Sequence, residues 1–148
     1  MKIKVTWIGK TKQAAIQALT EEYLRRISHY AEIVGLALKD EAAVLSLTRG
    51  GRPQNRERYK LVLLDPRGQQ LSSEELASLL EREQAIGTAL LFAIGGSDGF
   101  SEDARRQAGF TLSLGRMTLP HELARVVLLE QLYRAFTILQ KHPYHLGH

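Results

Sequence analysis

The residues best able to do chemistry gather near the end of the chain. Three of the five histidines, His142, His145 and His148, lie among the last seven residues, with Tyr144 between them. Imidazole and phenol rings stack on RNA bases and hydrogen-bond to them, and imidazole exchanges protons near neutral pH. Arg134, slightly earlier in the chain, can reach a phosphate. We therefore take Arg134, His142, Tyr144 and His145 as the candidate catalytic group.

Plainer interpretations of this group remain open. Histidines spaced by three can surround a metal ion, but no carboxylate or cysteine stands beside them and a chain end is usually mobile, so the sequence predicts no metal site. The tail can instead dock on a partner. Arg134 can simply pair with Glu130, four residues earlier on the same helix.

A second candidate site lies in two segments before the tail. The stretch Gly95-Gly96-Ser97-Asp98-Gly99 allows the backbone to approach a ligand closely, because glycine has no Cβ, although on spacing alone a tight strand-to-helix turn is the favoured explanation. The loop of residues 115–120 carries Met117 and Leu119 where solvent-facing residues are usual. A buried loop needs partners for its backbone, which a ligand or a neighbouring subunit can supply.

Several common chemistries are excluded by motifs that are missing. The sequence has no GxGxxG after its first strand and no GxxxxGK[ST], so the dinucleotide fingerprint and the phosphate-binding loop are absent. Ser113, His121 and Asp98 can be assembled into a hydrolase triad only on paper, because no nucleophile elbow supports them. The chain has no cysteine, which excludes disulfides, thiolate nucleophiles, zinc fingers and iron–sulfur clusters.

Composition bounds the remaining possibilities. The 148 residues suit one domain spanning 1–148, and a content of 44% hydrophobic and 24% charged residues is typical of a folded globular chain. No apolar run reaches the length of a membrane span, and the first ten residues do not resemble a signal peptide, so we expect a cytoplasmic protein. The net charge of +4 suits a polyanion such as RNA. A basic group can bind RNA or form a solvated loop: Arg49, Arg52, Arg56, Arg58 and Lys60.

Hydrophobic periodicity predicts strands that alternate with helices. We expect strands at residues 3–7, 32–38, 60–64, 88–94 and 110–114, helices at 16–30, 72–86 and 120–140, and short helical turns at 42–47 and after Ser101. A turn at residues 65–68 is predicted to end the third strand. This order favours an α/β layered fold with a mainly parallel sheet, in which loops 64–68, 95–99 and 114–120 share the ligand-binding edge. The last helix is apolar nearly all round, which suggests a second subunit against it.

The chain resembles the RlmH (YbeA) family of small SPOUT-class methyltransferases. The resemblance extends over essentially the whole chain, and these motifs carry it: Tyr23-Leu24-Arg25-Arg26, Gly95-Gly96-x-x-Gly99, Leu112-Ser113-Leu114-x-x-Met117-Thr118-Leu119-Pro120-His121, Arg125, Glu130-Gln131-Leu132-Tyr133-Arg134-Ala135 and His142-Pro143-Tyr144-His145.

The resemblance implies an S-adenosylmethionine-dependent homodimer that methylates N3 of a pseudouridine in 23S rRNA on assembled ribosomes. It implies a SPOUT-type fold whose carboxyl-terminal part is tied in a deep trefoil knot, an exception to the rule that chains do not thread loops. The cofactor positions it implies are Leu64, Gly95, Leu114, Gly115, Arg116, Met117, Thr118 and Leu119. The two alternatives are a non-enzymatic ribosome- or RNA-binding protein and a flavodoxin-like nucleotide-binding enzyme.

Overall fold

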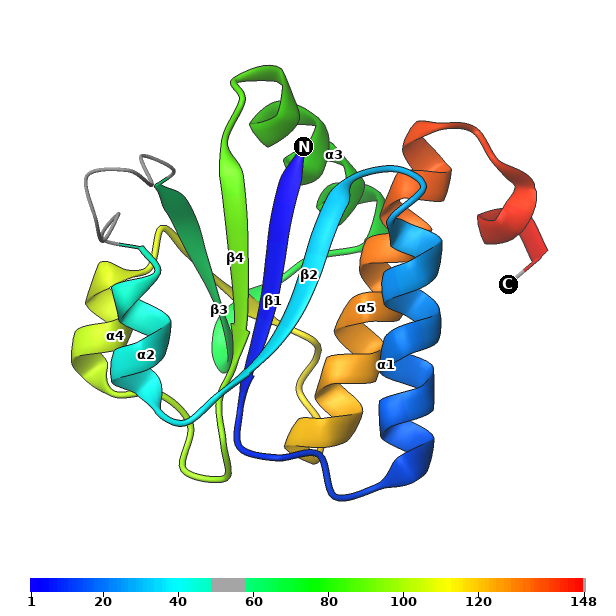
Figure 1. Cartoon of the computed structure of the whole chain (residues 1–148). Coiled ribbons are helices and arrows are strands. Elements are labelled where there is room, and N and C mark those ends of the chain that lie inside the picture. The colour runs from blue at the N-terminus through cyan, green and yellow to red at the C-terminus, as the bar shows by residue number, and fades with distance from the viewer. Residues whose placement is uncertain (49–57, 148) are drawn as a thin grey trace.

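A single parallel sheet organises the chain (Figure 1). The computed structural model describes residues 1–48 and 58–147. Within them the sheet has the order β2-β1-β4-β3-β5, and every strand pairing is parallel. The strands are β1 (Lys2–Ile8), β2 (Glu32–Leu38), β3 (Tyr59–Gln70), β4 (Ala89–Ile94) and β5 (Phe110–Ser113). The predicted α/β fold with a mainly parallel sheet is therefore confirmed.

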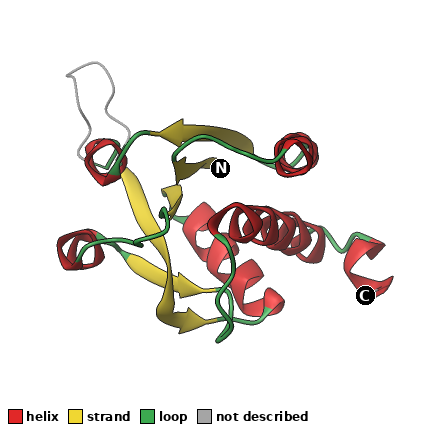
Figure 2. Ribbon diagram, turned by 90° about the horizontal axis from the view of Figure 1, so that it is seen from below, coloured by secondary structure: helices red, strands yellow, loops and turns green. Residues whose placement is uncertain are grey.

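Helices cover both faces of the sheet, as Figure 2 shows from below. One face carries the three long helices, α1 (Ala14–Ile27), α3 (Ser73–Ala85) and α5 (His121–Leu139), and the other carries the short helices α2 (Glu41–Ser46) and α4 (Glu102–Gln107). A 3₁₀ helix, η1 (Pro143–Gly147), follows α5. The predicted capping box at the start of α3 is present, because the Ser72 hydroxyl accepts the Glu75 N–H and the Glu75 carboxylate accepts the Ser72 N–H.

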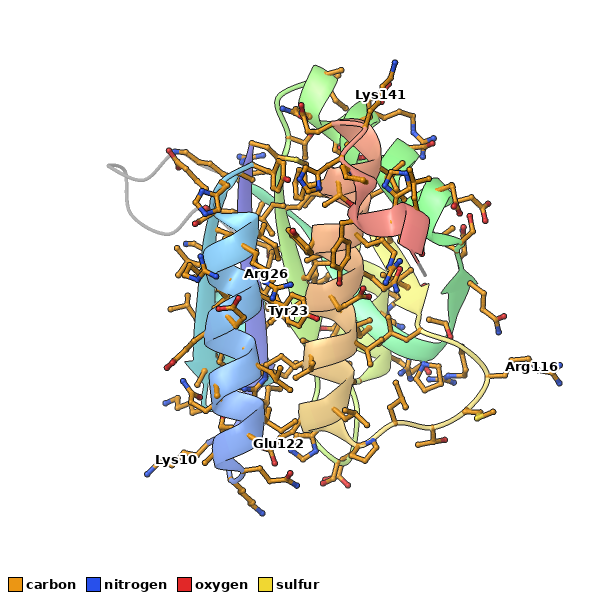
Figure 3. All side chains as sticks on the ribbon, turned by 90° about the vertical axis from the view of Figure 1, so that its right-hand side faces the viewer. Lys10, Tyr23, Arg26, Arg116, Glu122 and Lys141 are labelled. Atoms are coloured by element: carbon orange, nitrogen blue, oxygen red, sulfur yellow. The ribbon has the colours of Figure 1, made fainter. Side chains whose placement is uncertain are left out.

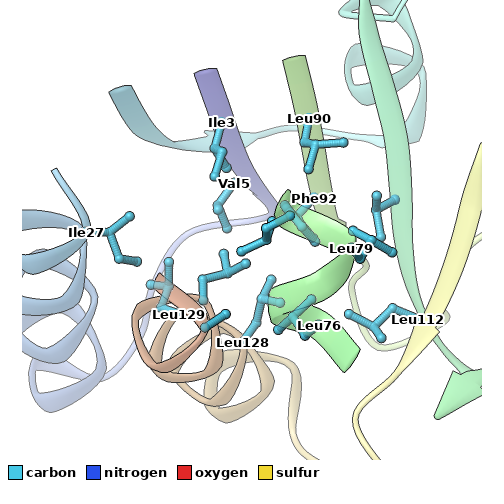
Figure 4. Packing of buried hydrophobic residues seen from close by; sticks show 14 of the residues in the cluster. Ile3, Val5, Ile27, Leu76, Leu79, Leu90, Phe92, Leu112, Leu128 and Leu129 are labelled. Carbon is cyan, nitrogen blue, oxygen red and sulfur yellow. The ribbon is translucent and has the colours of Figure 1, made fainter. Parts of the chain in front are cut away.

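The two faces of the central strands have separate hydrophobic cores. In β4, Leu90 and Phe92 point toward the long helices, and Leu91 and Ala93 point toward α2 and α4. Figure 4 shows the larger core, where residues of β1 and β4 meet those of α3 and α5. Burial on both faces explains the continuous apolar run in this strand, since parallel strands covered by helices have no polar face.

The end of β3 differs from the prediction. A turn was expected at residues 65–68, but β3 continues to Gln70, and these four residues form a bulge between Leu64 and Gln69, which both pair with Leu112 of β5. The local turn preference is satisfied inside the bulge, and pairing with β5 then resumes. Gly68 is required there, because a Cβ on it would lie 2.7 Å from the carbonyl carbon of Thr111.

Helix α5 is the centre of the larger layer. It packs between α1 and α3, and Leu128, Leu129 and Leu132 are fully buried. This packing within the chain explains much of its unusually apolar surface. Leu123 remains 41% exposed on the outer face. No helix among residues 1–48 and 58–147 combines the length and hydropathy that a membrane crossing requires.

Candidate functional site

The three segments predicted to share the ligand-binding edge of the sheet line one cleft. It has a volume of about 200 Å³ and lies between the β3 bulge, the loop after β4, and the loop that joins β5 to α5. Its lining consists of Leu64, Asp65, Pro66, Ile94, Gly95, Gly96, Ser97, Gly99, Leu114, Met117, Thr118, Leu119, His121 and Ala124. The carboxyl ends of β3, β4 and β5 thus meet around a concave site, as is usual for parallel sheets.

Six of the eight predicted cofactor positions lie in this cleft: Leu64, Gly95, Leu114, Met117, Thr118 and Leu119. Gly115 and Arg116 do not line it. Gly115 has a φ of 138° and contacts the Ser113 hydroxyl through its N–H and its carbonyl, which shapes the start of the loop. Arg116 extends away from the protein at the outer part of the loop (Figure 3).

The walls of the cleft are mostly nonpolar, and one of them is the glycine segment, residues 95–99. A Cβ on Gly95 would lie 3.2 Å from both the carbonyl carbon of Gly99 and the Phe100 ring, so a larger residue would crowd this turn. Met117 is 86% exposed at the mouth of the cleft. The chain itself therefore does not bury Met117 of the 115–120 loop. The Met117 side chain is available to contact a ligand or a second subunit.

Asp65 is the charged group held most tightly at this cleft. It is only 7% exposed, and it accepts hydrogen bonds from the Arg67 N–H at 2.8 Å and from Arg105 Nη1 at 3.1 Å. Burial by itself would raise the pKa of Asp65, but these two donors outweigh it and hold that pKa below its usual value. The carboxylate is therefore ionised at neutral pH. Sequence analysis missed it, although it adjoins the predicted Leu64, because the turn prediction gave no side-chain direction.

We expect Asp65→Asn to lower the free energy of unfolding by about 2 kcal/mol at pH 7, since both donors lose a charged acceptor. The folded-state pKa lies below the value of about 3.9 in an unfolded chain, so the stabilisation is complete above that value and is lost as the pH falls through the lowered pKa. Urea unfolding at pH 7 and pH 3 measures the difference in the free energy of unfolding between the wild type and Asp65→Asn, which should be smaller at pH 3. The exposed Asp98→Asn is the control, with no effect expected at either pH.

The start of α5, which contributes His121 and Ala124 to the cleft, is fastened to the start of α1. Glu122 accepts the Lys12 N–H at 2.8 Å, which lowers the pKa of the Glu122 carboxyl. Arg125 is fully buried one turn later, 3.9 Å from the centre of the Trp7 ring. These contacts fix the helix end that forms one wall of the cleft.

The predicted catalytic residues Arg134 and Tyr144 meet beside the second half of α5. Glu130 accepts a hydrogen bond from Arg134 Nε at 3.0 Å and another from the Tyr144 hydroxyl at 3.2 Å. The Arg134 guanidinium also lies 5.3 Å from the centre of the Tyr144 ring. Pairing of Arg134 with Glu130 is thus confirmed, and sequence analysis missed that the same carboxylate holds Tyr144.

The surroundings of Tyr144 favour its neutral form. Burial, a hydrogen bond with Tyr23 and the neighbouring Glu130 carboxylate all raise the pKa of Tyr144. Its ring meets the Tyr133 ring edge-on at 4.6 Å between centres. At neutral pH this phenol is therefore suited to hydrogen bonding or stacking and not to acting as a base.

The two tail histidines differ in their surroundings. His142 is exposed, and His145 is half-buried with no hydrogen-bond partner for its Nδ1 among the described residues. His148 lies outside them. No group of three residues that could hold a metal ion occurs in the described part of the chain.

The remaining sequence candidates are the basic group and the residues of the hydrolase triad. Arg49, Arg52 and Arg56 lie outside the described residues, and Lys60 pairs with Glu83 at 2.6 Å. Ser113 is buried and bonded to Gly115. No hydrogen bond joins Ser113, His121 and Asp98 in the part of the chain that the structure describes, so these residues do not form a hydrolase triad.

Within one chain, the tail and the cleft lie apart. His121 lines the cleft, whereas Glu130, which holds Arg134 and Tyr144, comes nine residues later, about 13 Å along the helix axis. Figure 1 shows that the chain turns back after α5, so that η1 lies on the side of the molecule away from the loops that form the cleft. The structure therefore brings most cofactor candidates together and two of the catalytic candidates together, but it does not join the two sets.

Comparisons with known proteins cover the whole chain. The family described as "Predicted SPOUT methyltransferase" matches residues 1–145. The chain is 55% identical to ribosomal RNA large subunit methyltransferase H of Koribacter versatilis, over 100% of both chains. It is 42% identical to the protein of the same name from Geobacter sp. strain M21, over 98% of this chain and 99% of that protein.

Solved structures of low sequence identity share the fold. The SpoU methyltransferase AviRb from Streptomyces viridochromogenes, in complex with AdoMet, has a TM-score of 0.55 at 13% identity, over 90% of this chain and 57% of that one. A probable methylase family protein from Haemophilus influenzae Rd KW20 has a TM-score of 0.57 at 12% identity, over 98% of this chain and 69% of that one.

Proposed function

This chain belongs to the SPOUT methyltransferase family, and from that premise we propose that it transfers the methyl group of S-adenosylmethionine to N3 of a pseudouridine in the 23S rRNA of assembled ribosomes. The observation that carries the proposal is full-length identity of 55% to a ribosomal RNA large subunit methyltransferase H. The cleft at the carboxyl edge of the sheet supports it, because it joins segments far apart in sequence around one small concave site.

The residues of the cleft fit this cofactor. Leu64, Leu114 and Leu119 supply a nonpolar surface for a nucleoside base, and the glycine segment leaves backbone groups accessible. The ionised Asp65 also lines the cleft, where a cationic cofactor would be compatible with its charge. When bound, the cofactor supplies a methyl group already activated for transfer, so the protein has to align it with the nitrogen and exclude water.

The tail supplies what the methyl acceptor requires. The N3–H of a pseudouridine is a weakly acidic imide, so a protein group must accept its proton or stabilise the resulting anion. Among the tail residues we assign proton acceptance to a histidine: to half-buried His145, whose buried Nδ1 has no hydrogen-bond partner among the described residues, or to exposed His142. Tyr144 orients or stacks on the base, and Arg134 stabilises negative charge.

A homodimer accounts for the separation of tail and cleft. Because a chain's own tail packs beside the second half of α5, away from its own cleft, we propose that the tail of one subunit completes the cleft of the other. Met117 and Leu123 are exposed at the cleft end of α5, and they support an apolar contact with the partner subunit there. We further propose one SPOUT domain over residues 1–148, with the family's trefoil knot around the residue 114–119 loop, working in the cytoplasm where ribosomes are found.

The test is methyl transfer from radiolabelled S-adenosylmethionine to ribosomes that lack the modification, compared with free rRNA, followed by mapping of the modified nucleotide. The proposal expects label at one pseudouridine and only on assembled ribosomes. Ribosome binding without incorporation would instead indicate a non-enzymatic RNA-binding protein. Flavin absorbance of the purified protein would indicate a flavodoxin-like enzyme.

A further inference from the structure

One arginine outside the cleft connects two of its three walls. Arg105 of α4 donates from Nη1 to Asp65 Oδ2 at 3.1 Å and to the Phe100 carbonyl at 2.9 Å. Asp65 lies in the β3 bulge, and Phe100 ends the glycine segment that follows β4. The same guanidinium group therefore holds two loops that are separated by about a quarter of the sequence but face each other across the cleft.

Both anchors of this arginine are themselves fixed. Asp65 is bound by the Arg67 N–H, and Phe100 is buried in the smaller core with Ala104. The base of α4 is held as well, because the Ser101 N–H and hydroxyl each donate to the Glu41 carboxylate at 2.7 Å. Arg105 also pairs with Glu102 through Nη2. Arg105 is thus held in place by several contacts. Its bonds to Asp65 and to the Phe100 carbonyl can therefore keep the two loops at a fixed spacing.

We infer that Arg105 is a positioning residue that sets cofactor affinity by holding the β3 bulge and the glycine segment at the spacing that the cofactor needs. It does not line the cleft, but it lines an adjoining hollow that shares Leu64, Asp65 and Ser97 with the cleft. A loop already held in its bound position loses less conformational freedom when a ligand binds, which strengthens binding. This inference rests on the proposed function of the cleft.

The test measures S-adenosylmethionine binding by calorimetry for Arg105→Met and its matched control Arg106→Met. Arg106 is the next residue of the same helix, is 75% exposed and pairs with Asp103 at 3.5 Å, away from the cleft. We expect Arg105→Met to raise the Kd about tenfold, the loss typical of one charged hydrogen-bonded group. The KM for the cofactor should rise in parallel, with kcat at saturating cofactor within about twofold of wild type. Arg106→Met should leave all three values unchanged.

A conservative variant separates positioning from general stability. Arg105→Lys keeps the charge and a nitrogen that can donate to both acceptors, but its side chain is shorter and has no second nitrogen to pair with Glu102 as Nη2 does, so we expect a Kd increase of about threefold. If Arg105→Met does not fold, Arg105→Lys and Arg105→Gln carry the same comparison. An unchanged Kd in the Arg105 variants, an equal change in Arg106→Met, or a fall in kcat alone would overturn the inference. Absence of binding by the wild-type protein would refute the proposed function instead.

Discussion

Arg134→Ala and His145→Ala are expected to reduce methyl transfer at least about 100-fold, the typical contribution of a positioned acid–base or electrostatic group. Cofactor affinity should remain at the wild-type value, because neither Arg134 nor His145 lines the cleft that holds the cofactor and their assigned roles concern the base that is methylated. Single-turnover incorporation of label into ribosomes measures the first effect, and calorimetry with S-adenosylmethionine measures the second.

Two exposed residues of the same types serve as controls for these variants. Arg82→Ala on α3 and His29→Ala after α1 remove the same groups from exposed positions that are not part of the tail, and both should retain full activity. Thermal unfolding checks that loss of the Arg134 pairing with Glu130 leaves the protein folded. Unchanged turnover in both tail variants would remove Arg134 and His145 from the mechanism.

Mixing two inactive variants tests which subunit supplies the tail. Gly95→Val is expected to close the cleft, because even a Cβ there meets the loop at 3.2 Å, and Arg134→Ala inactivates the tail. If the tail acts on the partner's cleft, random hybrid dimers contain one complete site, and the mixture should recover on the order of a quarter of wild-type activity. If each tail serves its own cleft, the hybrids contain no complete site and the mixture stays inactive.

Gly68→Ala is expected to lower the free energy of unfolding by about 3 kcal/mol, at the upper end of the usual cost of overpacking. The added Cβ would lie 2.7 Å from the carbonyl carbon and oxygen of Thr111 and 2.8 Å from the Leu112 nitrogen. These are backbone atoms of β5, so relief of the clash requires separation of β3 from β5. Urea unfolding monitored by circular dichroism measures the loss.

Gly96→Ala is the matched control for stability. Its added Cβ would meet only Ile8 Cγ2, at 3.9 Å, which is an ordinary contact. We therefore expect it to unfold at the urea concentration of the wild type. A Gly68→Ala protein that unfolds there too would show that the bulge does not pack against β5 as closely as the structure places it.

The sequence alone determined much of the fold, because the relevant signals are local. Alternating and continuous apolar runs predicted the strands, and the Ser72 capping box predicted the start of α3. The last helix was expected at residues 120–140 and spans His121–Leu139. Since the carboxyl ends of parallel strands share one edge, the order of the elements is enough to predict that the three loops of the cleft lie together.

The tertiary structure alone decided the contacts between distant segments. Turn preference at residues 65–68 did not end β3, because pairing of Gln69 and Gln70 with β5 competes with it and depends on which strand lies alongside. The bonds from Arg105 to Asp65 and Phe100 depend on the same neighbour relations. The distance between the tail and the cleft also depends on how the elements pack. A sequence motif identifies which chemical groups are present, but it does not determine where the folded backbone places them.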